Sequence, residues 1–180
     1  MLPPGHLAGG FLTAEALLKI TRPDLSSVQI SQLLCWGLFF SFAPDLDTFF
    51  GFIREQAWFV KDQRNNHRKF ISHAPLLWLT VGLLIYISSL DVYWKLVGLL
   101  LWLCSWSHFL LDSIEYGIMW LWPFSKKIYA LKNPERDFNN PETSFWKYWW
   151  HFVKAYARTL TFYCEIGIIL TALIIYFKIM

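Results

Sequence analysis

The stretch from residue 92 to residue 115, VYWKLVGLLLWLCSWSHFLLDSIE, is a long apolar segment with ionisable side chains gathered near its end. His108 and Asp112 are four residues apart, so they share one face of a helix. Ser105 and Glu115 lie three residues to either side and extend that face into a polar stripe. A carboxylate facing lipid or a dry core is costly alone, so it pairs, binds a metal or becomes neutral. We therefore expect the rest of the chain to supply partners.

The composition is typical of an integral membrane protein. Hydrophobic residues make up 56% of the 180-residue chain and charged residues 16%, whereas soluble domains average about 25% charged residues. Three segments approach the roughly 20 apolar residues that cross a bilayer, namely residues 74–90, 92–111 and about 160–177. We predict an all-α fold, an integral membrane bundle of about five helices with a polar site at one end. A single domain would span residues 1–180.

The remaining segments have recognisable roles in such a bundle. About residues 5–20 and 27–42 are apolar but short, so we expect half-buried or tilted helices there, the second one ending at Pro44. Residues 51–73 are interpreted as a polar, basic connection. Residues 145–156, FWKYWWHFVKAY, mix aromatic and basic side chains as interfacial helices do.

The directions of the helices predict where the polar residues meet. An antiparallel hairpin brings the start of the first helix level with the end of the second, and a second hairpin does the same for the next two helices. All four of these helix ends carry His or Asp. The residues expected to meet there, and to be candidate metal ligands, are His6, Asp45, Asp47, His67, His73, His108 and Asp112.

The positive charges follow the same division. Only Lys19, Arg22, Lys95 and Lys178 fall at the far end of the bundle, and the other Lys and Arg residues fall at the polar end. Short loops rich in Lys and Arg stay in the cytoplasm, so the site is expected to face the cytoplasm. A site that binds phosphate would also contain basic residues, whichever side of the membrane it faces.

Imidazoles and carboxylates together are ligands suited to Zn, Mn or Fe. Seven candidates exceed the needs of one ion, so two divalent ions, about 3.5–4 Å apart and bridged by a carboxylate, fit better. Such a site would activate water to attack an ester. Arg68 would hold an anionic substrate oxygen, and the basic loop and aromatic helix would hold lipid headgroups. We expect a lipid or small-molecule phosphoester as substrate, and no nucleic acid partner.

Five motifs follow one another along the chain: Gly5-His6, P-D-L-D at 44–47, H-R-x-x-x-S-H at 67–73, H-x-x-x-D at 108–112, and Gly117 with L-W-P-F-S at 121–125. In this order they resemble a known family, the inner-membrane metal-dependent hydrolases described in bacteria as LexA-regulated and membrane-associated. Their order covers residues 5–127, about two-thirds of the chain, and leaves about residues 145–180 as an interfacial and a terminal helix.

That family is in turn distantly similar to the zinc-dependent phospholipase C and P1 nuclease fold, an all-helical scaffold. The resemblance implies a bacterial inner-membrane enzyme with Zn, or Mn, as its ion. It implies as ligands His6, Asp45, His67 or His73, His108 and Asp112, with Asp112 bridging and Asp45 a possible catalytic base. The family's motif has histidines five apart, while His67 and His73 are six apart. Which of the two binds metal therefore stays open.

Two other functional hypotheses explain the same residues. A metal-ion carrier or sensor would use the cluster without hydrolysis, and a structural membrane subunit would use the polar stripe for helix association. His151 is expected to be an interfacial residue, and Glu165 a structural hydrogen-bonding group that faces the bundle, although both are weak candidates for C-terminal ligands.

Overall fold

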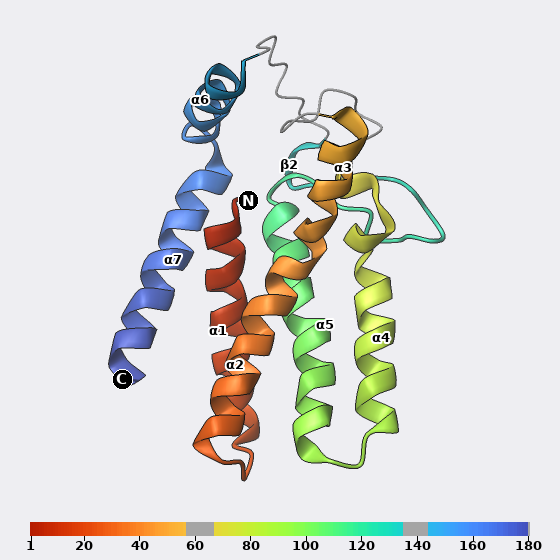
Figure 1. Cartoon of the computed structure of the whole chain (residues 1–180), viewed down its shortest axis with the longest axis vertical. Coiled ribbons are helices and arrows are strands. Elements are labelled where there is room, and N and C mark those ends of the chain that lie inside the picture. The colour runs from red at the N-terminus through yellow and green to blue at the C-terminus, as the bar shows by residue number, and fades with distance from the viewer. Residues whose placement is uncertain (57–66, 135–143, 180) are drawn as a thin grey trace.

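The computed structural model describes residues 1–56, 67–134 and 144–179, and it confirms the all-α prediction (Figure 1). Short 3-10 helices are labelled η. The elements are α1 (Pro3–Thr21), α2 (Ser27–Phe42), η1 (Ala43–Asp47), α3 (Thr48–Glu55), η3 (His67–Lys69), η4 (Ile71–His73), α4 (Pro75–Ser88), α5 (Val92–Asp112), β1 (Glu115–Tyr116), β2 (Lys132–Pro134), α6 (Phe145–Tyr156) and α7 (Leu160–Ile179). The two short strands pair in parallel beyond the end of α5.

Two antiparallel hairpins, α1–α2 and α4–α5, form the body of the bundle, as the helix directions predict (Figure 1). In each hairpin the two helices approach each other closely at glycine residues. A Cβ added to Gly37 would lie 2.6 Å from Ala14 Cβ, and one added to Gly98 would lie 2.6 Å from the carbonyl oxygen of Gly82. Because membrane helices gain little from hydrophobic burial against each other, close backbone contact at small residues supplies much of their packing.

The hairpins share a core made by α1, α2 and α5. Leu33, Leu100 and Cys104 are completely buried there, beside Ala14 of α1. α7 lies along the outer side of α1 and contacts little else in the body of the bundle (Figure 1).

The membrane spans differ from the expected ones in one respect. Among the described residues, three helical segments are long and apolar enough to cross a bilayer: Ser27–Arg54, Val92–Asp112 and Leu160–Lys178. The prediction of a span at residues 74–90 is wrong, because α4 has only 14 residues and is about 21 Å long, against about 30 Å of hydrocarbon.

The first span replaces it because the helical run continues beyond α2, although α2 itself ends at Phe42 as predicted. Pro44 is the second residue of the 3-10 helix η1, which follows α2 directly, and the chain continues through η1 into α3. Proline lacks only an N–H that the first turn of a helix leaves unused, so the chain need not break there. The predicted polar connection therefore starts as the amphipathic helix α3, and residues 57–66 of it lie outside the described residues.

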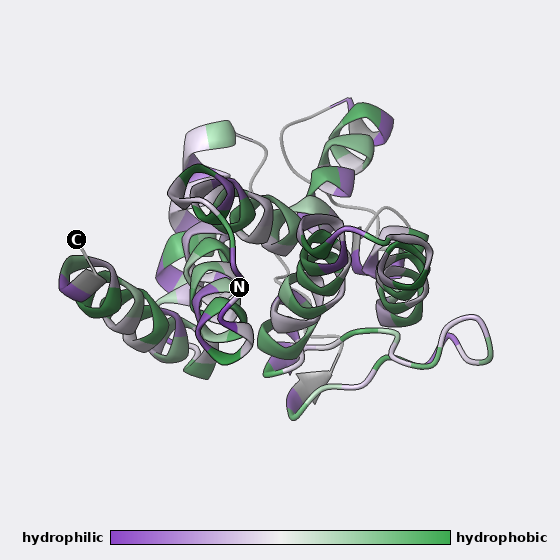
Figure 2. Cartoon of the chain, turned by 90° about the horizontal axis from the view of Figure 1, so that it is seen from below, coloured by the Kyte–Doolittle hydropathy of each residue, from purple (hydrophilic) through white to green (hydrophobic). Residues whose placement is uncertain are grey.

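Hydrophobic residues occur all along the helices (Figure 2), and many large apolar side chains are exposed on the outside of the bundle. Ile87 of α4 is 75% exposed and Ile174 of α7 is 56% exposed. In α6, Trp146 and Trp150 are exposed and Lys154 lies over the Trp150 ring, 4.8 Å from its centroid. Outward apolar faces of this kind match a lipid environment, and α6 matches the expected interfacial helix.

Candidate metal centre

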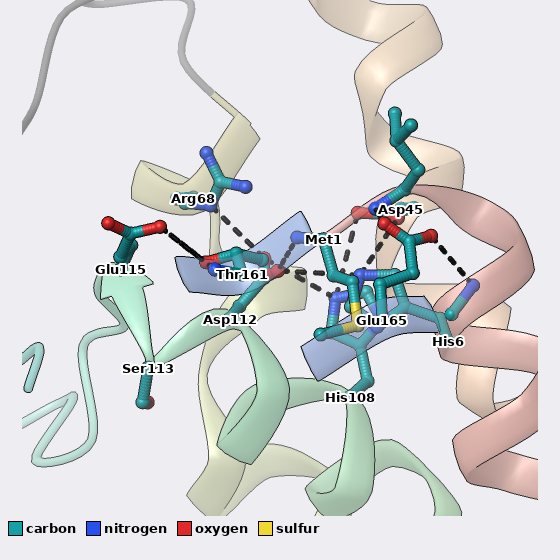
Figure 3. A network of polar contacts seen from close by, with 12 residues as sticks. Met1, His6, Asp45, Arg68, His108, Asp112, Ser113, Glu115, Thr161 and Glu165 are labelled. Atoms are coloured by element: carbon teal, nitrogen blue, oxygen red, sulfur yellow. Dashed lines mark hydrogen bonds and ion pairs between the residues drawn. The ribbon is translucent and has the colours of Figure 1, made fainter. Parts of the chain in front are cut away.

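The four helix ends predicted to meet do meet, at the end of the bundle where the chain begins (Figures 1 and 3). His6 comes from the first turn of α1, Asp45 from η1 and His73 from η4. His108 and Asp112 come from the last turns of α5. The three imidazoles are fully buried, and Asp112 is 1% exposed. Asp45 is the most accessible of the five, with 13% of its side chain exposed.

These side chains form two overlapping groups that could hold a metal ion. His6, His108 and Asp112 make one group, and Asp45, His73 and His108 make the other; within each, the ligand atoms lie within 4.8 Å of one another. His108 belongs to both, but one imidazole nitrogen binds one ion. The described residues therefore supply one site with three ligands and a second pair of ligands beside it.

The spacing of the facing atoms fits coordination better than direct hydrogen bonding. The Nε2 atom of His6 lies 3.4 Å from Asp112 Oδ1. Asp45 Oδ1 lies 3.5 Å from His73 Nε2 and 3.6 Å from His108 Nε2. Hydrogen bonds between such groups are about 2.7–3.2 Å long, whereas bonds of 2.0–2.1 Å to a tetrahedral ion would set the ligand atoms about 3.3 Å apart.

Two of the three imidazoles have a partner that fixes the ring. His108 Nδ1 is 2.9 Å from the carbonyl oxygen of Ser41, to which it donates. His73 Nδ1 is 2.8 Å from Asp47 Oδ2, which also accepts a hydrogen bond from the Ser72 hydroxyl. A hydrogen bond at Nδ1 fixes the tautomer and leaves the Nε2 lone pair to face the shared space, as in carboxylate–histidine–metal arrangements.

Asp47 was predicted to be a metal ligand, but its position in the structure is different. It lies behind His73, in neither of the two groups. Asp45 and Asp47 both belong to the 3-10 helix η1, where residues two apart point about 120° away from each other. Only Asp45 can face the shared space, and Asp47 holds its histidine from outside.

His6 lacks a comparable partner. Among the described residues, neither of its ring nitrogens has a hydrogen-bond partner, and both are buried. Its ring stacks on that of His108, with centroids 3.7 Å apart and planes 22° apart. Buried polar atoms of this kind are uncommon in proteins and call for a ligand or ion, so the donor set fits a divalent cation.

Arg68 was predicted to bind an anionic substrate oxygen, and in the structure it contacts one of the candidate ligands directly. Its Nε donates to Asp112 Oδ2 at 3.1 Å, and its guanidinium lies 4.8 Å from the centroid of the Tyr116 ring. Tyr116 has a φ of +74°, and Gly117 follows with a φ of +88°. The α-amino group of Met1 also pairs with Asp112. No sequence pattern points to Tyr116 or Ser41, since each is placed by tertiary contacts, whereas Ser72 belongs to the H-R-x-x-x-S-H motif.

The charges in the cluster stabilise one another. Burial alone lowers the pKa of Arg68, but the carboxylates of Asp112 and Asp45 raise it above its usual value. Burial also lowers the pKa of His73, and its interactions with the carboxylates of Asp45 and Asp47 outweigh burial and raise that pKa to about 9. In the metal-free cluster, His73 is therefore cationic at neutral pH and compensates the neighbouring carboxylates.

The other predicted residues lie elsewhere or outside the description. His67 begins η3, and its side chain lies outside the described part of the chain. Glu115 is buried and accepts hydrogen bonds from the backbone and hydroxyl of Thr161. Glu165 accepts a hydrogen bond from the Gly5 amide, as expected of a structural group. His151 is exposed on α6.

The whole chain resembles one family of membrane proteins. A family model described as YdjM inner membrane protein matches residues 1–180. No match is found among the curated proteins or among the solved structures. The family match agrees with the apolar helices in locating the chain in a membrane.

Proposed function

The chain belongs to the YdjM inner membrane protein family, and on that premise we propose that it is a membrane-bound, metal-dependent hydrolase that cleaves a phosphoester. One observation carries the proposal. Imidazoles and carboxylates from four helix ends converge on one buried space, and two of the imidazoles are fixed through Nδ1 with Nε2 facing inward. A purely structural polar cluster would instead satisfy its nitrogens by direct hydrogen bonds.

The donor set suits Zn, with Mn as the alternative, because it mixes imidazole and carboxylate. His6, His108 and Asp112 would hold one ion, and His73 with Asp45 a second. Asp45 would serve both, because Oδ1 faces His73 and His108 while Oδ2 lies 3.8 Å from His6 Nε2. We therefore assign the bridging role to Asp45. A bound divalent ion supplies Lewis acidity and lowers the pKa of a water ligand toward neutrality.

The chain's own residues complete the proposed chemistry. Asp45 is the accessible carboxylate of the cluster, so it is the group placed to accept a proton from an attacking water. Arg68 is bound to Asp112 through Nε. Its positive charge beside the cluster would draw in an anionic phosphoester and hold Asp112 in its ionised state.

Exposed apolar side chains lie at this end of the bundle. In α3, Phe50 is 63% exposed and Ile53 is 71% exposed. Trp146 and Trp150 are exposed in α6, which lies at the same end (Figure 1). Such surroundings favour a lipid or lipid-linked substrate over a soluble one. The basic residues at this end support a site facing the cytoplasm.

The proposal is tested on purified, detergent-solubilised protein supplied with Zn or Mn. We expect bound metal at one to two ions per chain and hydrolysis of an anionic phospholipid or a chromogenic phosphodiester. His108→Ala should lower the amount of bound metal and abolish hydrolysis, because it removes a ligand from the three-ligand site. His151→Ala is the matched control, since that histidine is exposed on α6. A wild-type chain without bound metal, or a His108→Ala variant with unchanged activity, contradicts the proposal.

A metal-ion sensor or carrier is the second candidate, and one observation favours it. All three imidazoles are 0% exposed, which leaves an ion easier to accommodate than a large substrate. A carrier, however, would place its ligands near the middle of the membrane, while this cluster lies at helix ends. Metal flux into vesicles, measured beside hydrolysis, separates the two functions.

A further inference from the structure

Glu165 of α7 is a buried carboxylate outside both groups of candidate ligands. It is 4% exposed. Its Oε1 accepts a hydrogen bond from the Gly5 amide at 3.0 Å, and its Oε2 accepts one from the Tyr156 hydroxyl. Three elements thus meet at this side chain: the first turn of α1, the end of α6 and the first half of α7.

The sequence of α1 makes that contact specific. Pro3 and Pro4 occupy the first two positions of the helix and have no N–H, so Gly5 supplies the first amide donor. A carboxylate at this end also opposes the positive pole of the helix dipole. A Cβ added to Gly5 would lie 2.6 Å from Met1 Sδ and 2.8 Å from Glu165 Cγ, so a side chain at this position would crowd the carboxylate.

The next residue in the chain is His6. His73 is oriented by Asp47, and His108 by the carbonyl oxygen of Ser41. No hydrogen-bond partner of this kind reaches either ring nitrogen of His6 among the described residues. The direction of its ring therefore depends on where the first turn of α1 lies, together with its stacking on His108.

We infer that Glu165 is a positioning residue for His6: it fixes the first turn of α1 and so places His6 Nε2 against Asp112 and Asp45. The inference rests on the proposed metal site. Partners beyond the direct ligands typically change metal affinity by about 10–100-fold. Gly5 and His6 thus act together: Gly5 leaves room for the Glu165 carboxylate, and this carboxylate fixes the position of His6.

The test measures Zn affinity by competition with a chelating dye, on the full chain in detergent. Glu165→Gln keeps the size of the side chain and removes its charge, and we expect about a tenfold or greater loss of affinity. Gly5→Ala should give a loss of similar size by pushing the carboxylate away. Thr161→Val is the matched control, because it removes a buried hydrogen bond at the same helix but leaves α1 untouched.

A double-mutant cycle identifies the route of the effect. If Glu165 acts through His6, Glu165→Gln should cost nothing further in a His6→Ala background. An equal loss in both backgrounds overturns the inference, as does wild-type affinity in Glu165→Gln. The Co(II) absorption spectrum of Glu165→Gln should also shift, because a displaced imidazole changes the ligand field, while that of Thr161→Val should not.

A readout without metal separates this inference from the proposed function. Amide hydrogen exchange at residues 5–9 should become faster in Glu165→Gln and stay unchanged in Thr161→Val. A wild-type chain that binds no metal overturns the proposed function, and loss of protection at residues 5–9 would still support the positioning of α1 by Glu165. Unchanged protection overturns the positioning even if wild-type protein binds Zn.

Discussion

The Nδ1 atom of His73 lies 2.8 Å from Asp47 Oδ2, on the side of the ring away from Asp45. The two nitrogens of one imidazole therefore face two aspartates that are two positions apart in the chain. Asp45 shares the central space with the other histidines, and Asp47 lies behind. This relationship divides a P-D-L-D motif into one candidate ligand and one residue that orients a ligand.

Replacing Asp47 with Asn is the first prediction. The change preserves shape but weakens the acceptor that fixes His73, so metal affinity should fall by about 10–100-fold with the number of bound ions unchanged. Asp45→Ala should instead reduce the number of ions, because Asp45 is a candidate ligand. Metal content and competition titrations distinguish these results. Equal loss of ions in both variants would make Asp47 a ligand after all.

The second prediction concerns pH. His73 has a pKa of about 9 in the metal-free cluster, so at neutral pH it carries a proton that a bound cation must displace. Metal affinity should therefore rise with pH, by up to about tenfold per unit, and level off near pH 9. Calorimetry in buffers of different ionisation enthalpy should show proton release at pH 7. Asp47→Asn lowers the pKa of His73, so its plateau should begin at lower pH; an unchanged profile contradicts this account.

Much of this architecture was predictable from the sequence because helix directions depend on local signals. Apolar runs, caps and turns define where each helix starts and stops, and antiparallel hairpins then bring the ends that carry His6, His73 and His108 together. The continuation of the chain past Pro44 into α3 was not predicted, because it depends on whether a 3-10 turn follows the end of α2. The division between Asp45 and Asp47 needs the direction of each side chain in that turn.

The pairing of Arg68 with Asp112 could not be predicted for a different reason. The two residues are 44 positions apart, and a basic residue beside His67 suits a substrate anion as well as a carboxylate ligand. Glu165 is similar: its partner Gly5 lies 160 positions away. The contact between Glu165 and Gly5 follows from the packing of α7 on α1, and no single residue predicts that packing.

The third prediction tests the glycine contact between α4 and α5. In Gly98→Ala the new methyl would lie 2.6 Å from the carbonyl oxygen of Gly82, so the helices must separate. Overpacking of this kind lowers the unfolding free energy by about 1–3 kcal/mol. This loss exceeds the stability gained from the higher helix propensity of alanine. Gly167→Ala is the control, because nothing lies within 4 Å of a Cβ at that position. Equal unfolding free energies in detergent for Gly98→Ala and wild type would show that the contact contributes nothing.

The last prediction concerns orientation. Phe124 is 88% exposed at the end of the bundle with the cluster, and Leu90 is 96% exposed between α4 and α5 at the far end. The native cysteines to be replaced beforehand are Cys35, Cys104 and Cys164. In intact cells whose outer membrane has been permeabilised, an impermeant maleimide should label Leu90→Cys and spare Phe124→Cys if the basic end faces the cytoplasm as we propose. After the inner membrane is disrupted, both variants should react. Labelling of Phe124→Cys alone in intact cells would place the cluster on the periplasmic side, and the clustered Lys and Arg residues would then be explained by an anionic substrate.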